Sequence, residues 1–136
     1  MSDRIFIDSN IFVYSIDDGD VQKQATAKSI VSALSENGGV VSTQVLQEFY
    51  NVITSKLKCP KDKAKRFVEH IANTFPVHKN SVADILRAIE ISIRTRFSFW
   101  DSLIISAAVS ESCTTLYSED LNDGQIVEGI TIRNPL

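Results

Sequence analysis

The sequence predicts an α/β fold: a three-layer α/β/α domain over residues 1–136, with a central parallel sheet of four to five strands. Short runs rich in β-branched residues alternate along the chain with longer segments in which apolar residues recur every three or four positions. Strands that are separated by helices pair in parallel, and helices cover both faces of such sheets. The 136 residues, 43% of them hydrophobic, suffice for one domain with a sizeable core.

The first quarter of the chain has a strand followed by two helices. Residues 4–8 contain the β-branched and aromatic run Ile-Phe-Ile, which is too short for a helix and predicts a buried strand. A short helix is predicted at 9–15. The turn "DDGD" at 17–20 ends in an acid that can cap the next helix, at 21–37. Two glycines at the end of that helix favour its termination.

The middle of the chain repeats the alternation. A second short strand is predicted at 40–42, and a helix with an apolar face at 44–57. Pro60 precedes a further helix at 61–74, where the missing N–H of proline is tolerated. A weak strand is expected at 75–77.

The last third contains two helices and two strands. A serine followed three residues later by an acid, at 81–84, has the form of a capping box and opens a helix. A second helix is predicted at 100–111. Strands are predicted at 114–118 and 130–133, with an Asp-Gly turn between them.

Charge and cysteine content restrict the classes of function. A net charge of −3 argues against a protein that binds nucleic acid over its whole surface, but it allows a local basic patch. No apolar run approaches the roughly 18 residues of a membrane span, so no membrane partner is expected. Cys59 and Cys113 are isolated, and the opening "MSDRIF" lacks the pattern of a secretory signal. We therefore expect a cytoplasmic protein.

Acidic residues lie at four predicted element boundaries. Asp8 follows the first strand, Glu48 lies one turn into the helix after the second, and Asp101 begins a later helix. Glu119 and Asp120 follow the strand at 114–118. Because ligands of parallel α/β sheets bind beyond the carboxyl ends of the strands, we expect these carboxylates to lie close together.

Carboxylates gathered in a poorly hydrated pocket repel one another unless a cation is bound. Mg²⁺ and Mn²⁺ prefer such oxygen ligands, and a pair of these ions can promote hydrolysis of a phosphodiester. Each acid also has a purely structural interpretation: Asp8 as a helix cap, Asp101 as a first-turn acid, Asp120 as a turn residue, and Glu48 as a surface acid. The hypothesis of a metal site therefore depends on their joint placement.

Four segments of the chain resemble a known family. "IFIDSNIFVY", "STQVLQEFYNV", "FSFWDSLIISAA" and "TTLYSEDLNDGQ" are similar to the four signature segments of PIN-domain proteins, in the right order and over nearly the whole chain. The VapC-type toxins of toxin–antitoxin pairs are the nearest match. The resemblance implies a PIN-like domain that acts as a single-strand-directed endoribonuclease. It also implies that Mg²⁺ or Mn²⁺ is held by Asp8, Glu48, Asp101 and Asp120.

The resemblance implies further residues and partners. Asn10, Ser118 and Asp123 match supporting positions that orient ligands or water. The adjacent acids of "SED" leave the fourth ligand open between Glu119 and Asp120; we assign Asp120, and expect Glu119 to face solvent. The implied partners are an RNA substrate, a small antitoxin protein and a second copy in a homodimer.

Other interpretations compete with a nuclease. The main alternative is a catalytically inactive PIN-like module that binds RNA or protein. A dehalogenase-like phosphatase would require a second aspartate where Asn10 stands. The basic segment 56–66 could contact RNA, although a solvated helix surface is the simpler interpretation. We expect Trp100 in the core or in a dimer interface, and His78 without a partner.

Overall fold

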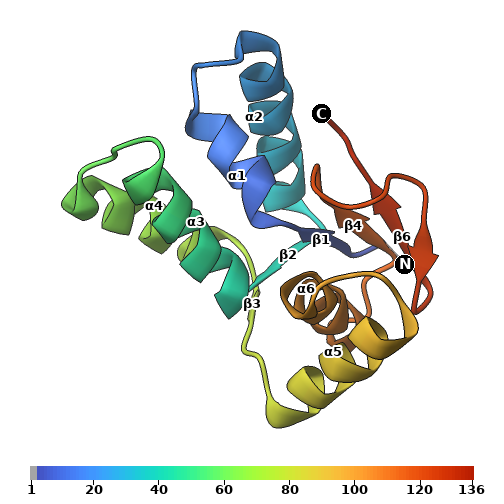
Figure 1. Ribbon diagram of the computed structural model, residues 1–136. Helices are drawn as coiled ribbons and strands as arrows, with labels where there is room; N and C mark the ends of the chain where they lie inside the picture. The colour runs from blue at the N-terminus through green and yellow to red at the C-terminus, as the bar shows by residue number, and fades with distance from the viewer. Residues whose placement is uncertain (1–2) are drawn as a thin grey trace.

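The fold class predicted from the sequence is confirmed by a computed structural model, which describes residues 3–136 (Figure 1). Met1 and Ser2, part of the predicted domain, lie outside the described residues. The strands are β1 (Ile5–Ile7), β2 (Gly39–Ser42), β3 (Val77–His78), β4 (Thr115–Tyr117), β5 (Ile126–Val127) and β6 (Ile130–Arg133). The helices are α1 (Ser9–Ile16), α2 (Val21–Glu36), α3 (Thr43–Ser55), α4 (Lys61–Thr74), α5 (Val82–Arg94) and α6 (Phe99–Ser110).

The strands form one twisted sheet in the order β3-β2-β1-β4-β6-β5. In Figure 1, α1 and α2 lie above this sheet and α5 and α6 lie below it, while α3 and α4 extend to one side. The central strand β1 pairs in parallel with β2 and β4, so that Phe6 lies between Val40 and Leu116. The carboxyl ends of these three strands therefore meet at one edge of the sheet.

Within the described residues five strands, β3, β2, β1, β4 and β6, pair in parallel, which confirms the predicted four to five. The sheet also has one antiparallel strand that was not predicted. The additional strand is β5, which pairs antiparallel with β6 through a turn at Glu128 and Gly129. Both turn residues have positive φ, at 53° and 78°, as the tight turns of two-residue hairpins require. A strand of two residues, one exposed and one buried, is too short to produce a periodic signal in the sequence.

The core lies between the sheet and the helices. α6 is buried all round from Ser102 to Ala108, which explains why its sequence is apolar on every side. Despite that apolar character, no helix within residues 3–136 has both the length and the hydropathy to cross a membrane. The capping box predicted at Ser81 and Asp84 is present, with each side chain accepting from the backbone N–H of the other residue.

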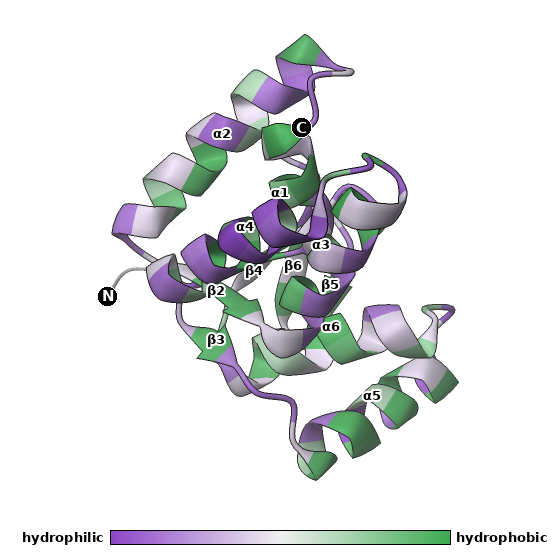
Figure 2. Ribbon diagram, turned by 90° about the vertical axis from the view of Figure 1, so that its left-hand side faces the viewer, coloured by the Kyte–Doolittle hydropathy of each residue, from purple (hydrophilic) through white to green (hydrophobic). Residues whose placement is uncertain are grey.

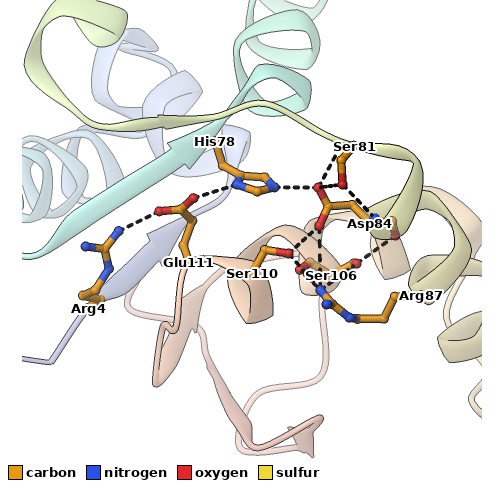
Figure 3. A network of polar contacts seen from close by, with 8 residues as sticks. All are labelled: Arg4, His78, Ser81, Asp84, Arg87, Ser106, Ser110 and Glu111. Carbon is orange, nitrogen blue, oxygen red and sulfur yellow. Dashed lines mark hydrogen bonds and ion pairs between the residues drawn. The ribbon is translucent and has the colours of Figure 1, made fainter.

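Asp84 has a second role that the sequence did not indicate (Figure 3). Its Oδ2 lies 2.7 Å from Nε2 of His78, and the other ring nitrogen of that histidine lies 2.7 Å from Glu111. Ser110 also donates to Asp84, and Arg4 forms an ion pair with Glu111 at 2.8 Å. The expectation that His78 has no partner is therefore wrong. The network joins the residue that precedes β1 to β3, α5 and α6.

The charges of this network reinforce one another. Burial opposes ionisation of Asp84, but hydrogen bonds from Ser110, the Ser81 backbone and His78 outweigh it and lower the pKa of Asp84 to about 2. Burial also opposes the charge on His78, yet the hydrogen bonds to Asp84 and Glu111 raise the pKa of the imidazole. The pair is thus ionised at mildly acidic pH and fixes the α5–α6 hairpin to the sheet.

We predict that Asp84→Asn lowers the free energy of unfolding by about 2–4 kcal/mol at pH 6, as measured by urea denaturation. The folded-state pKa of Asp84 is below its ordinary 3.8, so this contribution is complete above about pH 4 and is lost as the pH falls towards 2. The contribution of His78 is complete below pH 6.5 and is lost as the pH rises through its raised pKa. Asp62→Asn, on an exposed acid, is the control; equal stability of both variants would contradict the prediction.

Candidate functional site

Asp8 occupies the junction between β1 and α1. Its Oδ1 accepts a hydrogen bond of 2.7 Å from the backbone N–H of Ser9, and its Oδ2 accepts one of 2.8 Å from the hydroxyl of Ser118. Only 6% of Asp8 is exposed to solvent. Asp8 therefore does cap α1, as its structural interpretation proposed, and it also lies buried at the carboxyl edge of the sheet. Capping α1 uses Oδ1 of Asp8, whereas the contact with Ser118 at the edge of the sheet uses Oδ2, so the two are compatible.

Asn10 and Ser118 connect Asp8 to Asp120. The amide nitrogen of Asn10 donates to Ser118 Oγ at 3.2 Å and to Asp120 Oδ2 at 3.1 Å. Its amide oxygen accepts from the backbone N–H of Glu119 at 3.1 Å. The Ser118 hydroxyl also accepts from the backbone N–H of Asp120 at 3.2 Å. These bonds fix the positions of both aspartates relative to each other.

Helices α3 and α6 bring Glu48 and Asp101 to the same edge. Asp101 lies in the first turn of α6, which Ser98 caps. Gln44, one turn before Glu48 on the same face of α3, donates to the backbone oxygen of Trp100 at 3.0 Å and so ties the two helices together. Sequence reasoning missed Gln44; the signal was an amide one helical turn from a proposed metal ligand.

Asp123 and Glu119 lie apart from this group. The carboxylate of Asp123 accepts from the backbone N–H of Asn134 at 2.9 Å and so holds the C-terminal segment. The carboxylate of Glu119 forms an ion pair of 2.7 Å with Lys23, and 20% of its side chain is exposed. The expectation that Glu119 faces solvent is therefore wrong. Of the two adjacent acids, Asp120 is the one whose carboxylate contacts Asn10; Glu119 contacts Asn10 only through its backbone N–H.

The four acids influence one another electrostatically. Burial, together with repulsion from Asp120 and Asp101, raises the pKa of Asp8 to about 6. Burial, with repulsion from Asp8 and the other two aspartates, raises the pKa of Glu48 to about 7. Burial and the charge of Asp120 also raise the pKa of Asp101. The structure thus brings the four predicted acids within range of each other's charge.

These residues fit a divalent cation by charge and by donor chemistry. Every side-chain donor is a carboxylate oxygen, the kind that Mg²⁺ and Mn²⁺ prefer. Oε1 of Glu48 and Oε1 of Gln44 are buried and have no hydrogen-bond partner, so the site contains unsatisfied acceptors. Within residues 3–136, no three acidic, histidine or cysteine side chains converge tightly enough to enclose an ion. The site therefore suits a divalent cation by its negative charge and by its oxygen ligands.

Other residues with expected roles have simpler positions. Trp100 is 62% exposed, so of the two expected places, the core and a dimer interface, the core is excluded. The basic residues of the segment 56–66 are all exposed, which fits both a solvated surface and contact with RNA. A cavity of about 480 Å³ opens at the opposite edge of the sheet beside Arg4 and Gly39, and none of the four site acids lines it.

Fold and site together define an α/β protein with a carboxylate cluster at the carboxyl edge of a mostly parallel sheet. The chain belongs to the PIN-domain family, because the family model for the PIN domain matches residues 5–123. PIN nucleases generally depend on divalent metals. No curated protein sequence matches the chain.

Solved structures share the fold at low sequence identity. VapBC from Salmonella typhimurium bound to DNA superposes with a TM-score of 0.73 at 14% identity, over 99% of this chain and 100% of that one. VapBC2 from Rickettsia felis, bound to a promoter DNA fragment, gives 0.71 at 18%, over 96% and 97%. VapC20 from Mycobacterium tuberculosis, a toxin that cleaves the sarcin–ricin loop, gives 0.69 at 18%, over 85% and 89%.

We predict that Asp8→Asn raises the free energy of unfolding by about 1–3 kcal/mol at pH 7.5 in EDTA and has little effect at pH 4. The folded-state pKa of Asp8, about 6, exceeds its ordinary 3.8, so ionisation destabilises the metal-free fold as the pH rises from about 4 to 6. Asparagine keeps the acceptor for Ser9 without the charge. Urea denaturation measures the effect, with exposed Asp18→Asn as control. Loss of folding in Asp8→Asn would instead make Asp8 a structural cap.

Proposed function

We propose that the protein is a metal-dependent endoribonuclease that hydrolyses phosphodiester bonds in RNA, the toxin of a toxin–antitoxin pair. The observation that carries this proposal is the cluster of four acids from four separate segments of the chain, in which burial and mutual repulsion raise the pKa of Glu48 to about 7. Asp8, Glu48 and Asp101 would hold Mg²⁺ or Mn²⁺, and Asp120 would complete the site or position the attacking water. Membership of the PIN-domain family supports this chemistry.

The protein's own groups would prepare the site for the cation. When bound, the metal would supply an activated water and stabilise the leaving oxygen. The hydroxyl of Ser118 and the backbone N–H of Ser9 hold the two oxygens of Asp8. The amide of Asn10 holds Asp120. Such fixed carboxylates need little rearrangement when a cation and a phosphate arrive.

The proposed partner that controls the activity is a small antitoxin that covers the acidic edge. Support comes from the similar structures, among them VapBC assemblies and a toxin–antitoxin complex from Klebsiella pneumoniae, which superposes with a TM-score of 0.72 at 16% identity over 97% of this chain and 98% of that one. The exposed Trp100, in the first turn of α6 next to Asp101, offers such a partner a large apolar contact. The free thiols of Cys59 and Cys113 support a reducing cytoplasm as the place of action.

We also propose that the protein forms a homodimer through α5. One face of α5 is apolar yet exposed (Figure 2), and this apolar face consists of Val82, Ile85, Leu86, Ile89 and Ile93. Together these side chains expose several hundred square ångströms, a large part of the roughly 800 Å² that each partner of a standard interface buries. In an antiparallel pair of α5 helices, each face would cover the other about a two-fold axis.

The nuclease proposal predicts that purified protein, free of any antitoxin, cleaves a mixed-sequence RNA pool when Mn²⁺ is present and stops cleaving when EDTA is added. Asp120→Asn should lower the cleavage rate by about tenfold or more, because it removes a negative charge from the proposed metal site. Cleavage is followed by gel electrophoresis and by sequencing of the RNA ends.

Glu119→Gln is the matched control for Asp120→Asn. It removes one carboxylate from the neighbouring position, which pairs with Lys23, and it should change the rate by no more than about threefold. A larger loss of cleavage rate in Glu119→Gln than in Asp120→Asn would make Glu119 the fourth acid of the site. Absence of cleavage by the wild type under every metal condition would favour the inactive binding module.

The dimer proposal predicts that Leu86→Lys and Ile93→Lys convert a dimer into a monomer, because each places a charge in the apolar face of α5. Size-exclusion chromatography with light scattering measures the mass. Val21→Lys is the control, since Val21 is 73% exposed but lies on α2, away from that face. A wild type that remains monomeric at high concentration would contradict the proposal.

A further inference from the structure

Two cavities open beside the acid cluster and share one lining residue. The first, about 410 Å³, lies between the α5–α6 connection and the segment after β4, and is lined by Arg96, Asp101 and Asp120 among others. The second, about 270 Å³, lies between α1 and the end of α3, and is lined by Asn10, Lys56 and Asp120 among others. Because Asp120 is their only common residue, the cavities lie on different sides of it.

Each cavity contains a cation that has no partner within the described residues. Arg96 and Lys56 are exposed and form no hydrogen bond or ion pair through their side chains in residues 3–136. The contrast with neighbouring cations is direct. Arg94, in the same cavity as Arg96, is paired with Glu128. Lys23 is neutralised by Glu119 beside the other cavity.

An RNA strand needs such free cations at this edge. The four acids repel phosphate, and bound divalent ions would offset this repulsion only over the acids themselves. The phosphates on either side of the bond to be cut would still lie beside a negatively charged cluster. A guanidinium can hold a phosphate through two parallel hydrogen bonds, and a lysine ammonium can hold one as a point charge.

We propose that Arg96 and Lys56 bind the two RNA phosphates that flank the phosphate at the acid cluster. The strand would then run from the Lys56 cavity, across Asp120, into the Arg96 cavity. The inference rests on the proposed ribonuclease function, and it adds where the substrate strand lies and which residues hold it. Each cavity is near the lower size of small-ligand sites, roughly 300 Å³, and can therefore receive about one nucleotide.

Salt-dependent binding tests the proposal directly. The probe is a fluorescein-labelled 12-nucleotide single-stranded RNA of mixed sequence, and its anisotropy is measured with each protein at 50–400 mM KCl in EDTA. Each phosphate contact to single-stranded nucleic acid adds about 0.7 to the slope of log K against log salt. Arg96→Gln and Lys56→Gln should each reduce the slope by that amount and raise the Kd about five- to tenfold at low salt. The double variant should lose about twice as much slope.

Matched variants separate these roles from general charge. Lys28→Gln removes one exposed cation elsewhere, on α2, and should leave slope and Kd unchanged. Arg96→Lys keeps the charge and should keep the slope. Circular dichroism should give the same melting temperature for all variants, because the altered side chains are exposed.

Cleavage in Mn²⁺ by the same proteins distinguishes failure of this inference from failure of the proposed function. If the wild type cleaves RNA but the slopes of Arg96→Gln and Lys56→Gln match those of the controls, the flanking contacts are wrong and the nuclease stands. If the wild type binds RNA with the predicted slopes but never cleaves, the contacts stand and the nuclease does not. If it neither binds nor cleaves, both are wrong.

Discussion

The hydrogen bond from the Ser118 hydroxyl to Asp8 joins the ends of the two central strands at the carboxyl edge of the sheet. Both residues are buried, so this contact has little competition from water. The rest of the site depends on it, because Ser118 also accepts from Asn10 and from the backbone of Asp120. Because the ends of the two strands are adjacent, this contact fixes the spacing between the carboxylates of Asp8 and Asp120.

Two buried aspartates in this protein respond to burial in opposite ways. Asp84 receives hydrogen bonds from several donors and faces an imidazole, and its pKa falls to about 2. Asp8 receives two hydrogen bonds but faces other carboxylates, and its pKa rises to about 6. The first arrangement has its counter-charge within the chain and stabilises the fold; the second lacks one. A divalent cation, as proposed for this site, would supply the counter-charge that Asp8 lacks within the described residues, whereas Asp84 needs none.

The sequence was sufficient for what depends on local pattern. The helices, the capping box at Ser81 and the placement of four acids at one edge of the sheet were all predictable, because periodicity, caps and topology determine them. It was insufficient for what depends on side-chain packing. The sequence identified Asp84 only as the acid of a capping box, because no local pattern indicates that His78 lies beside it. The pairing of Glu119 with Lys23 joins residues 96 positions apart and has no local signal.

Which individual charges are paired matters more for binding at the acid cluster than the net charge of the protein does. A net charge of −3 describes a protein that repels nucleic acid on average. Yet several of its arginines and lysines are neutralised by specific acids, as Arg94 is by Glu128, and these contribute little field of their own. Arg96 lies only two residues away and retains its full charge beside the acid cluster. An acidic chain can thus carry cations that are unpaired within the described residues, Arg96 and Lys56, beside its cluster of carboxylates.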